Sequence, residues 1–267
     1  MEPRPLISLT TDFGYKDPFV AIMKGVILSI NPSVRIVDIT HDISPQNIQE
    51  AAFMLEMSYG SFPHNAIHVA VVDPSVGSER RPLLVVTAHH YFIGPDNGVF
   101  SRIYNSSERL EVIHITSDHY FLPQRSSTFH GRDVFAPVAA WMSKGIDISK
   151  FGDRVSDYVT IPVPKPIITD NNHIEGEIIH IDRFGNSITN IDIQKILAGK
   201  RLDINPKVVI KGMEVPLKKY YSEGEDNKLY SLINSFGYLE LFVNRENAST
   251  DFEITIGEKV RVILNVA

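Results

Sequence analysis

The feature that most constrains the fold of this chain is a segment with proline at alternate positions, past the middle of the sequence. Residues 161–167 read Ile-Pro-Val-Pro-Lys-Pro-Ile. Proline fixes φ and lacks an amide hydrogen, so this spacing favours an extended backbone and excludes a regular helix. The residue patterns on the two sides of the segment also differ. We therefore predict a domain at residues 1–160, a proline-rich linker at 161–169 and a second domain at 170–267.

Before the linker, short β-branched runs alternate with stretches of helical periodicity. The pattern predicts strands at 6–10, 34–39, 67–72, 83–87, 91–93 and 110–115, and helices at 17–30, 44–58 and 131–144. Ser44 is the expected N-cap of the second helix, with proline in its first turn. Strands joined through helices run parallel, so we expect an α/β domain with a largely parallel central sheet.

Beyond the linker, nearly every patterned run has strand character. The expected strands are residues 175–181, 187–191, 207–210, 238–243 and 259–264. This half of the chain therefore predicts an all-β domain, a small barrel or sandwich.

Composition excludes several classes of function. The chain of 267 residues contains no cysteine, which excludes disulfides, thiolate metal sites and cysteine catalysis. Its formal net charge is −6 and it has no block of lysine and arginine, so we expect a small-molecule partner and no nucleic acid. The first residues lack a secretory apolar core and no apolar run reaches membrane-spanning length, so the expected location is the cytoplasm, without membrane contact.

Acidic turns follow the first three predicted strands. Asp12 follows the first strand, residues 38–42 end the second with two aspartates, and Asp73 follows the third. In open α/β sheets ligands bind outside the carboxyl ends of the strands, where such side chains can converge. Aspartate is also common in turns for local reasons, so a structural role for each one stays open.

Three ionisable residues indicate the chemistry. Asp73 and Arg80 lie in VVDPSVGSERR, and His130 lies in STFHGRDVF. An acid, a permanent cation and an imidazole can hold and polarise a water molecule, and no serine or cysteine nucleophile arrangement accompanies them. Water is therefore the expected attacking group. A polar network without catalysis is the alternative, since buried acid–base sets also serve structure.

A metal site is the other alternative for these side chains. The candidate ligands would be His41, Asp42, Asp73, His89, His90 and His130. Their spacing matches no metal motif, and the adjacent His89 and His90 fit a solvated turn better, because neighbouring residues on a strand point to opposite faces. We predict that the site holds no metal.

In their order along the chain, TTDFGYKDPFVAIMKG, VVDPSVGSERR, GPDNGVF, FHGRDVFAP and IDRFGNSITNID closely resemble the S-adenosyl-L-methionine (SAM) hydroxide adenosyltransferases. These adenosine-forming SAM hydrolases are related to the fluorinase and chlorinase enzymes. The resemblance runs from Leu6 to Leu264. It implies an N-terminal α/β domain, a C-terminal β-barrel domain, and a homotrimer whose active sites lie between one subunit's N-terminal domain and its neighbour's C-terminal domain.

The resemblance also implies an activity, the hydrolysis of SAM to adenosine and L-methionine without a cofactor. Asp73, Arg80 and His130 correspond to the water-activating set, in which Asp73 and His130 orient and deprotonate the water and Arg80 stabilises hydroxide. By the same resemblance, the related halogenases carry a tyrosine at the position of Asp73. Asp73 thus favours a hydrolase over the alternatives, a chloride adenosyltransferase or a non-catalytic SAM- or adenosine-binding protein.

Further residues match substrate contacts of the family. Asp12 matches the acid that holds the ribose hydroxyls, and Asp17 the acid near the methionine amino group. Phe129 lies where an aromatic residue lines the pocket. The barrel-domain contacts implied by the resemblance are Asp182 at the methionine end, Asn186 at the adenine and Ser235 near the carboxylate. Phe236 stands where the fluorinase type has arginine, which leaves the carboxylate contact open.

Overall fold

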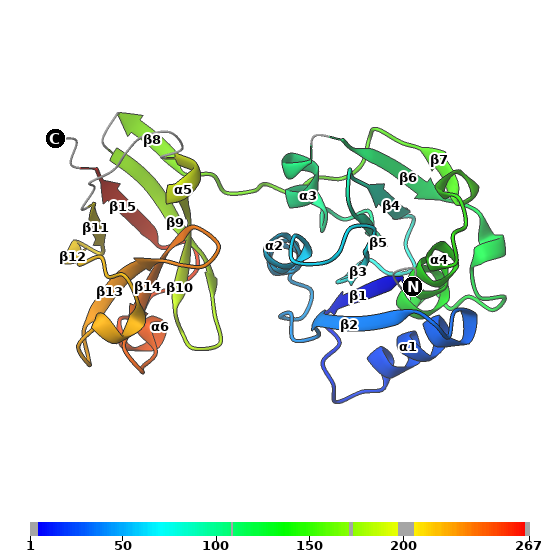
Figure 1. Cartoon of the computed structure of the whole chain (residues 1–267), viewed down its shortest axis with the longest axis horizontal. Helices are drawn as coiled ribbons and strands as arrows, with labels where there is room; N and C mark the ends of the chain where they lie inside the picture. The colour runs from blue at the N-terminus through cyan, green and yellow to red at the C-terminus, as the bar shows by residue number, and fades with distance from the viewer. Residues whose placement is uncertain (1–4, 108, 171–172, 197–205, 265–267) are drawn as a thin grey trace. The chain divides into compact units, whose positions relative to one another are not determined.

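The protein forms two compact units, Met1–Val163 and Pro164–Ala267 (Figure 1). The computed structural model describes residues 5–107, 109–170, 173–196 and 206–264. No helix among these residues is long and apolar enough to span a membrane. Each unit has its own hydrophobic core, so the two are described separately.

The first unit is built on a seven-stranded sheet in the order β2-β1-β3-β5-β4-β6-β7. Its strands are β1 Leu6–Thr11, β2 Arg35–Thr40, β3 Ile67–Val71, β4 Pro82–Val86, β5 Tyr91–Pro95, β6 Glu111–Ile115 and β7 Gly152–Arg154. Its α-helices are α1 Phe19–Ile30, α2 Ile48–Tyr59, α3 Ser101–Ser106 and α4 Ala136–Ser143. Short 3₁₀ turns lie at Asp118–Tyr120 and Ile148–Lys150.

This sheet is mixed, where the sequence predicted a largely parallel one. Strands β2, β1, β3 and β5 pair in parallel, whereas β4 pairs antiparallel with β5 and β6, and β6 with β7. The reason is the connection between β4 and β5, a tight turn closed by a bond from Thr87 N to His90 O. A turn of that length can only join antiparallel neighbours.

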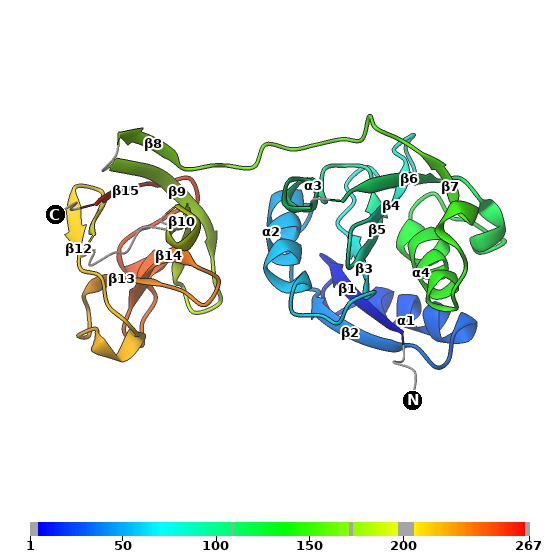
Figure 2. The same cartoon turned by 45° about the horizontal axis from the view of Figure 1, so that its top comes forward.

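Helices cover both faces of the sheet (Figure 2). Alternate strand residues face the two sides: Val69 packs in the core beside α1 and α4, and Ala70 in the core beside α2 and α3. Successive side chains of a strand point to opposite faces, so two apolar layers require the nearly continuous apolar runs seen in the sequence.

Besides α1, which begins at Phe19 and not at residue 17, two helix starts differ from the sequence prediction. The second helix begins at Ile48 with Asn47 as its N-cap, whose side chain accepts from Glu50 N at 3.1 Å. Ser44 is not the cap, because Gln46 has a φ of 66° and interrupts any helix beginning there. The helix predicted at 131–144 starts as a π-helical turn, Gly131–Phe135, before α4. Such turns are frequent at functional sites.

The second unit is an antiparallel, nearly closed, barrel-like sheet in the order β12-β11-β15-β9-β10-β14-β13. Its strands are β8 Ile167–Asp170, β9 His173–Ile181, β10 Ser187–Asp192, β11 Lys207–Ile210, β12 Met213–Val215, β13 Leu229–Ile233, β14 Tyr238–Val243 and β15 Lys259–Ile263. Helices α5 Ile193–Ile196 and α6 Ala248–Asp251 and a 3₁₀ turn, Tyr221–Glu223, accompany them. A bridge between Leu217 and Ser231 links the chain after β12 to β13. Strand β8 occupies the end of the predicted linker.

Candidate functional site

Asp73 and Arg80 form a buried ion pair just beyond the carboxyl end of β3. Arg80 Nε donates to Asp73 Oδ1 at 3.1 Å and to Oδ2 at 2.8 Å, and Nη2 also donates to Oδ2. The side chain of Asp73 is 4% exposed and that of Arg80 6%. An isolated charge at such a position is costly, so each residue requires the other.

The imidazole of His130 completes a three-residue set with this ion pair. Arg80 Nη2 lies 2.8 Å from His130 Nδ1. A guanidinium only donates, so Nδ1 accepts, and the hydrogen-bond network assigns the proton of the neutral ring to Nε2. Burial and then the charge of Arg80 lower the pKa of His130, against the opposing effect of nearby carboxylates. The ring therefore presents an N–H donor, and not a basic nitrogen, on its Nε2 side.

Close approach of two loops brings His130 to the ion pair. Gly77 has a φ of 82°, and a Cβ built on it would lie 2.1 Å from the carbonyl oxygen of Ser127. Glycine alone adopts this conformation freely and leaves room for the neighbouring backbone. The loop of residues 73–80 thus packs directly against the loop of residues 126–130.

A buried carboxylate supports the second loop. Asp133 is fully buried and accepts from Ser126 N at 2.7 Å and from Arg132 Nε at 2.6 Å. Burial acts to raise the pKa of Asp133, but these two donors hold it below its ordinary value. Sequence reasoning did not identify Asp133 as a supporting residue, since a single sequence does not distinguish a buried acid from an exposed one at a helix start.

A cavity of about 410 Å³ brings together four of the six predicted residues of the first unit, and Arg80 is not among its lining residues. Asp12, Asp73, Phe129 and His130 all line it. Asp17 is exposed before α1 and is not among the lining residues. The cavity lies where the loops after β1, β2 and β3 meet, as expected for ligand binding outside the carboxyl ends of parallel strands.

Asp12 and an aromatic wall face this cavity. Gln46 N donates to Asp12 Oδ2 at 2.8 Å, a contact that sequence reasoning missed because it is made by the backbone. The ring of Phe129 packs edge-on against Phe13 and Phe19, with centroids 5.9 and 5.4 Å away. Arg80 Nη1 is buried and, within the described part of the chain, has no hydrogen-bond partner. The cavity therefore combines an acceptor, an apolar wall and a neighbouring cation.

The second unit has its own cavity, of about 550 Å³, lined by Asp182 and Asn186. Asp182 Oδ1 accepts from the backbone of Phe184 and Asn186, both at 2.9 Å, and Oδ2 accepts from Asn186 Nδ2 at 3.0 Å. These bonds shape the hairpin turn after β9. Sequence reasoning missed Tyr221 and Arg245, which also line the cavity and stand in segments without a recognisable motif.

Ser235 is exposed in the turn between β13 and β14 and does not line this cavity. The turn is held by Asn234, whose side chain accepts from Phe236 N at 3.0 Å and donates to Glu240 at 3.1 Å. Tyr221 OH donates to the same carboxylate at 2.7 Å. Burial raises the pKa of Glu240. The buried acid thus links the Ser235 turn to the lining residue Tyr221.

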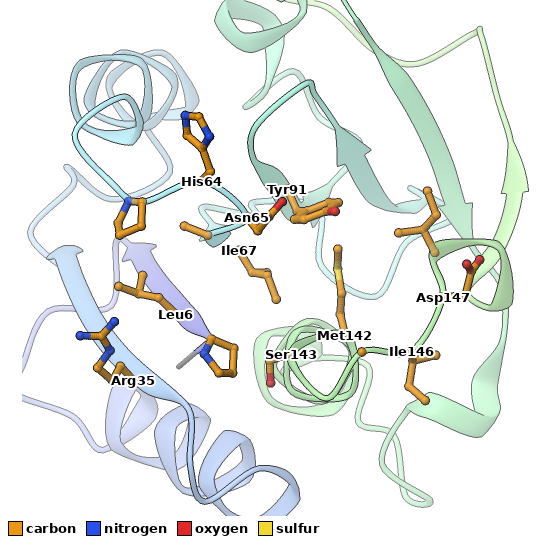
Figure 3. A pocket seen from close by; sticks show the side chains of 15 residues that line it. Leu6, Arg35, His64, Asn65, Ile67, Tyr91, Met142, Ser143, Ile146 and Asp147 are labelled. Atoms are coloured by element: carbon orange, nitrogen blue, oxygen red, sulfur yellow. The ribbon is translucent and has the colours of Figure 1, made fainter. Parts of the chain in front are cut away.

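Another cavity of the first unit, of about 570 Å³, lies at the opposite end of the sheet (Figure 3). It is lined by the first residues of β1, β2, β3 and β5, namely Leu6, Arg35, Ile67 and Tyr91. None of the predicted site residues lines it. Although this cavity is larger, the acid–imidazole chemistry lies at the carboxyl ends of the strands, so we take the cavity beside Asp73 as the candidate site.

The histidines considered for a metal site are distributed differently. No group of three or more histidine or acidic side chains is positioned to hold a metal ion among the residues that the structure describes. His90, expected in a solvated turn, is buried, with Nδ1 3.4 Å from His68 Nε2 and its ring against Tyr59. The short β4–β5 turn places His90 at the start of a strand, where it packs on the sheet.

Comparison with known proteins identifies the family. The model of the SAM hydroxide adenosyltransferase N-terminal domain matches residues 7–152, and that of the C-terminal domain matches residues 176–261. The chain belongs to the SAM hydroxide adenosyltransferase family. The Asp73–Arg80–His130 set of this chain therefore lies within the range matched by the N-terminal domain model, and the hairpin with Asp182 and Asn186 lies within the range matched by the C-terminal one.

The curated relatives include proteins named as hydrolases and proteins named as fluorinases. A protein of Methanocaldococcus jannaschii named (R)-S-adenosyl-L-methionine hydrolase is 37% identical, covering 97% of this chain and 95% of its own. A fluorinase of Nocardia brasiliensis is 26% identical, covering 97% of both. A crystal structure of a conserved Thermotoga maritima protein has a TM-score of 0.89 at 33% identity, covering 96% of this chain and 99% of the other. Of these two curated relatives, the hydrolase is the more similar.

Proposed function

We propose that this protein hydrolyses SAM to adenosine and L-methionine. The observation that carries the proposal is the buried Asp73–Arg80–His130 set, because Asp73 and His130 line the same cavity as Asp12 and an aromatic wall. The hydrolase names of similar full-length relatives support it. An acid and a neutral imidazole beside a cation suit the activation of water. By the family resemblance, the halogenases carry a tyrosine at the position of Asp73, which favours hydrolysis over halogenation.

The reaction needs no acid for the leaving group. The water oxygen bonds to the 5′ carbon of the ribose while the carbon–sulfur bond breaks, and that electron pair stays on sulfur. The positively charged sulfonium leaves as the neutral thioether of methionine, so the chain must position a nucleophile and remove its proton. We propose that this occurs without a metal or other cofactor.

The contacts around His130 support a division of roles within the set. Because Nδ1 of His130 accepts from Arg80, the ring donates through Nε2–H and does not take the proton of the water. Asp73 is then the base, held in place by Arg80. The free Nη1 hydrogens of Arg80 favour negative charge as hydroxide develops. This replaces the shared base role that the sequence suggested for His130.

Substrate binding follows the resemblance. Asp12 holds the ribose hydroxyls and the aromatic ring of Phe129 lines the pocket. Asp182 and Asn186 contact the methionine and adenine ends, with Asp17 and Ser235 as further contacts. A homotrimer, in which a barrel domain of one subunit meets the N-terminal domain of its neighbour, would bring both groups of residues to one SAM molecule. The exposed Phe236 leaves the carboxylate contact to another group.

Incubation with SAM in oxygen-18 water tests the proposal. We expect adenosine with the label in its 5′ hydroxyl, at the same rate after exhaustive chelation. The two sulfonium epimers should be assayed separately, since the relatives' name specifies the (R) form. Adenosine without label, or none above the spontaneous background, would refute hydrolysis. A 5′-chlorinated nucleoside formed in chloride would instead support the halogenase alternative, and loss of activity on chelation would refute the metal-free mechanism.

A further inference from the structure

The loop between β1 and α1 carries two of the cavity residues, Asp12 and Phe13. The loop itself contains few stabilising features, because Gly14 has a φ of 63° and α1 begins without a side-chain cap. Phe13 N donates to Thr11 Oγ1 at 3.2 Å. The position of the Asp12 carboxylate therefore depends on contacts from other segments.

One buried residue, His41, contacts this loop at three points. His41 directly follows β2 and is 1% exposed. Its carbonyl oxygen accepts from Gly14 N at 2.8 Å, and its Nδ1 lies 2.8 Å from Thr11 Oγ1. Its ring meets the ring of Tyr15 edge-on, with centroids 5.1 Å apart. These contacts surround Asp12 in the sequence on both sides.

Asp38 orients the imidazole of His41. His41 Nε2 lies 3.1 Å from Asp38 Oδ1, although the contact lacks hydrogen-bond geometry and neither atom has a hydrogen-bond partner among the described residues. Because a carboxylate only accepts, this contact favours the tautomer with its proton on Nε2, in which Nδ1 accepts from the Thr11 hydroxyl. The Thr11 oxygen in turn accepts from Phe13 N. The donors and acceptors therefore form a consistent chain from Asp38 to the loop.

The same segment after β2 also reaches the carboxylate itself. Gln46 N donates to Asp12 Oδ2, which leaves Oδ1 available to a ligand. His41 does not line the cavity. A residue that fixes a ligand-binding loop without touching the ligand acts through geometry, because a binding group must be held close to its productive position to contact the ligand.

We infer that His41 is a positioning residue, which holds the Thr11–Tyr15 loop through Thr11 so that Asp12 meets the ribose hydroxyls of SAM. This inference rests on the proposed function, because it assigns a substrate contact to Asp12. Asp73, Arg80 and His130 belong to other loops, so loss of the His41 contact should weaken substrate binding more than it slows the chemical step.

The test compares two hydroxyl groups on the same strand. Thr11→Val removes the hydroxyl bonded to His41 at nearly constant volume, and Thr11→Ser keeps it. The matched control is Ser8→Ala, because Ser8 lies earlier on β1, its Oγ is 2.7 Å from Nδ1 of the buried His68, and neither residue lines the cavity. We expect Thr11→Val to raise the KM for SAM about tenfold, the effect of one weakened hydrogen bond to a charged group, with kcat changed less than about threefold. Thr11→Ser and Ser8→Ala should keep the wild-type KM, although Ser8→Ala lowers the melting temperature.

The outcomes separate this inference from the proposed function. An unchanged KM in Thr11→Val, or an equal rise in Ser8→Ala, would overturn the positioning role while hydrolysis stands. If the wild-type protein does not turn over SAM, the proposed hydrolysis is refuted. The positioning role is then tested by calorimetry, in which the dissociation constant of adenosine should rise in Thr11→Val and stay unchanged in Thr11→Ser and Ser8→Ala. Absence of adenosine binding as well would overturn both. Thr11→Ala serves if Thr11→Val does not fold.

Discussion

Arg80 lies between the two other ionisable groups of the candidate site, and this determines how each of them can act. Its guanidinium occupies both oxygens of Asp73 and the Nδ1 atom of His130. Since arginine never accepts a hydrogen bond, a protonated His130 would place two donors against each other. The set is therefore intact only while His130 is neutral, and burial and Arg80 both lower its pKa.

We expect a pH dependence with a defined direction. Because the pKa of His130 lies below its ordinary value of 6.5, the ring is neutral at pH 7 and becomes charged only as the pH falls below 6.5. The kcat/KM for SAM should thus be constant near neutrality and decrease on the acid side, below pH 6.5. The measurement is a pH–rate profile of the wild type and of His130→Gln, whose amide donates but does not titrate. A decrease centred above pH 6.5 that His130→Gln abolishes would contradict this assignment.

At the scale of elements, two loops from different parts of the chain carry the ionisable set of the site. The loop after β3 carries Asp73 and Arg80, and the loop before the π-helical turn carries Phe129 and His130. Their backbones approach each other closely at Gly77, where a side chain would collide with the carbonyl of Ser127. The distance between the ion pair and the imidazole therefore depends on a glycine that takes no part in the chemistry.

Gly77→Ala should lower both stability and activity. The variant combines an unfavourable positive φ with a collision against backbone, so we expect a loss of about 3 kcal/mol in the free energy of unfolding. The displaced His130 loop should reduce kcat by about tenfold or more. Gly145→Ala is the control, since Gly145 has a φ of 85° but open space around it, and should cost about 1 kcal/mol without changing kcat. Denaturant unfolding and initial rates measure both; a wild-type kcat in Gly77→Ala would refute the role of this contact.

At the scale of the whole molecule, residues assigned to one substrate are divided between two compact units. Asp12, Asp73 and His130 line a cavity of the first unit, and Asp182 and Asn186 line a cavity of the second. In the proposed ring of three subunits, each site takes its first half from one chain and its second half from the next. Defects in the two units should then complement each other.

Co-expression of Asp73→Asn with Asn186→Ala tests this arrangement. Each variant alone should have strongly reduced activity at low SAM concentration. In any mixed trimer that follows this ring order, one of the three junctions joins two intact halves, so purified mixed oligomers should recover about one third of the wild-type rate. If the two variants carry different affinity tags, the mixed oligomers can be isolated by purification on both tags. Rates no higher than those of the separate variants would indicate that each chain forms its site alone.

The local elements were largely predictable because hydrophobic period and turn residues report on the backbone directly. Strands β11 and β14 lie at the predicted residues, and α1 begins two positions later than expected. The strands β7, β8, β12 and β13 were missed; the first three are short, and a few residues carry little periodicity. The prediction of a largely parallel sheet was wrong because strand direction depends on which strands become neighbours.

The sequence by itself determined the residue types of the site, the change from α/β to all-β patterning and the ordered motifs that indicate the family. Only the tertiary structure decided that Arg80 lies between Asp73 and His130, which are far apart in the chain, and hence which nitrogen of His130 carries the proton. It also decided that His41 and the backbone of Gln46 hold the Asp12 loop. The hydrophobic periodicity of a segment reflects which of its residues face solvent and which face the core. The contacts named above arise instead from packing between segments that are distant in the sequence, which no local pattern predicts.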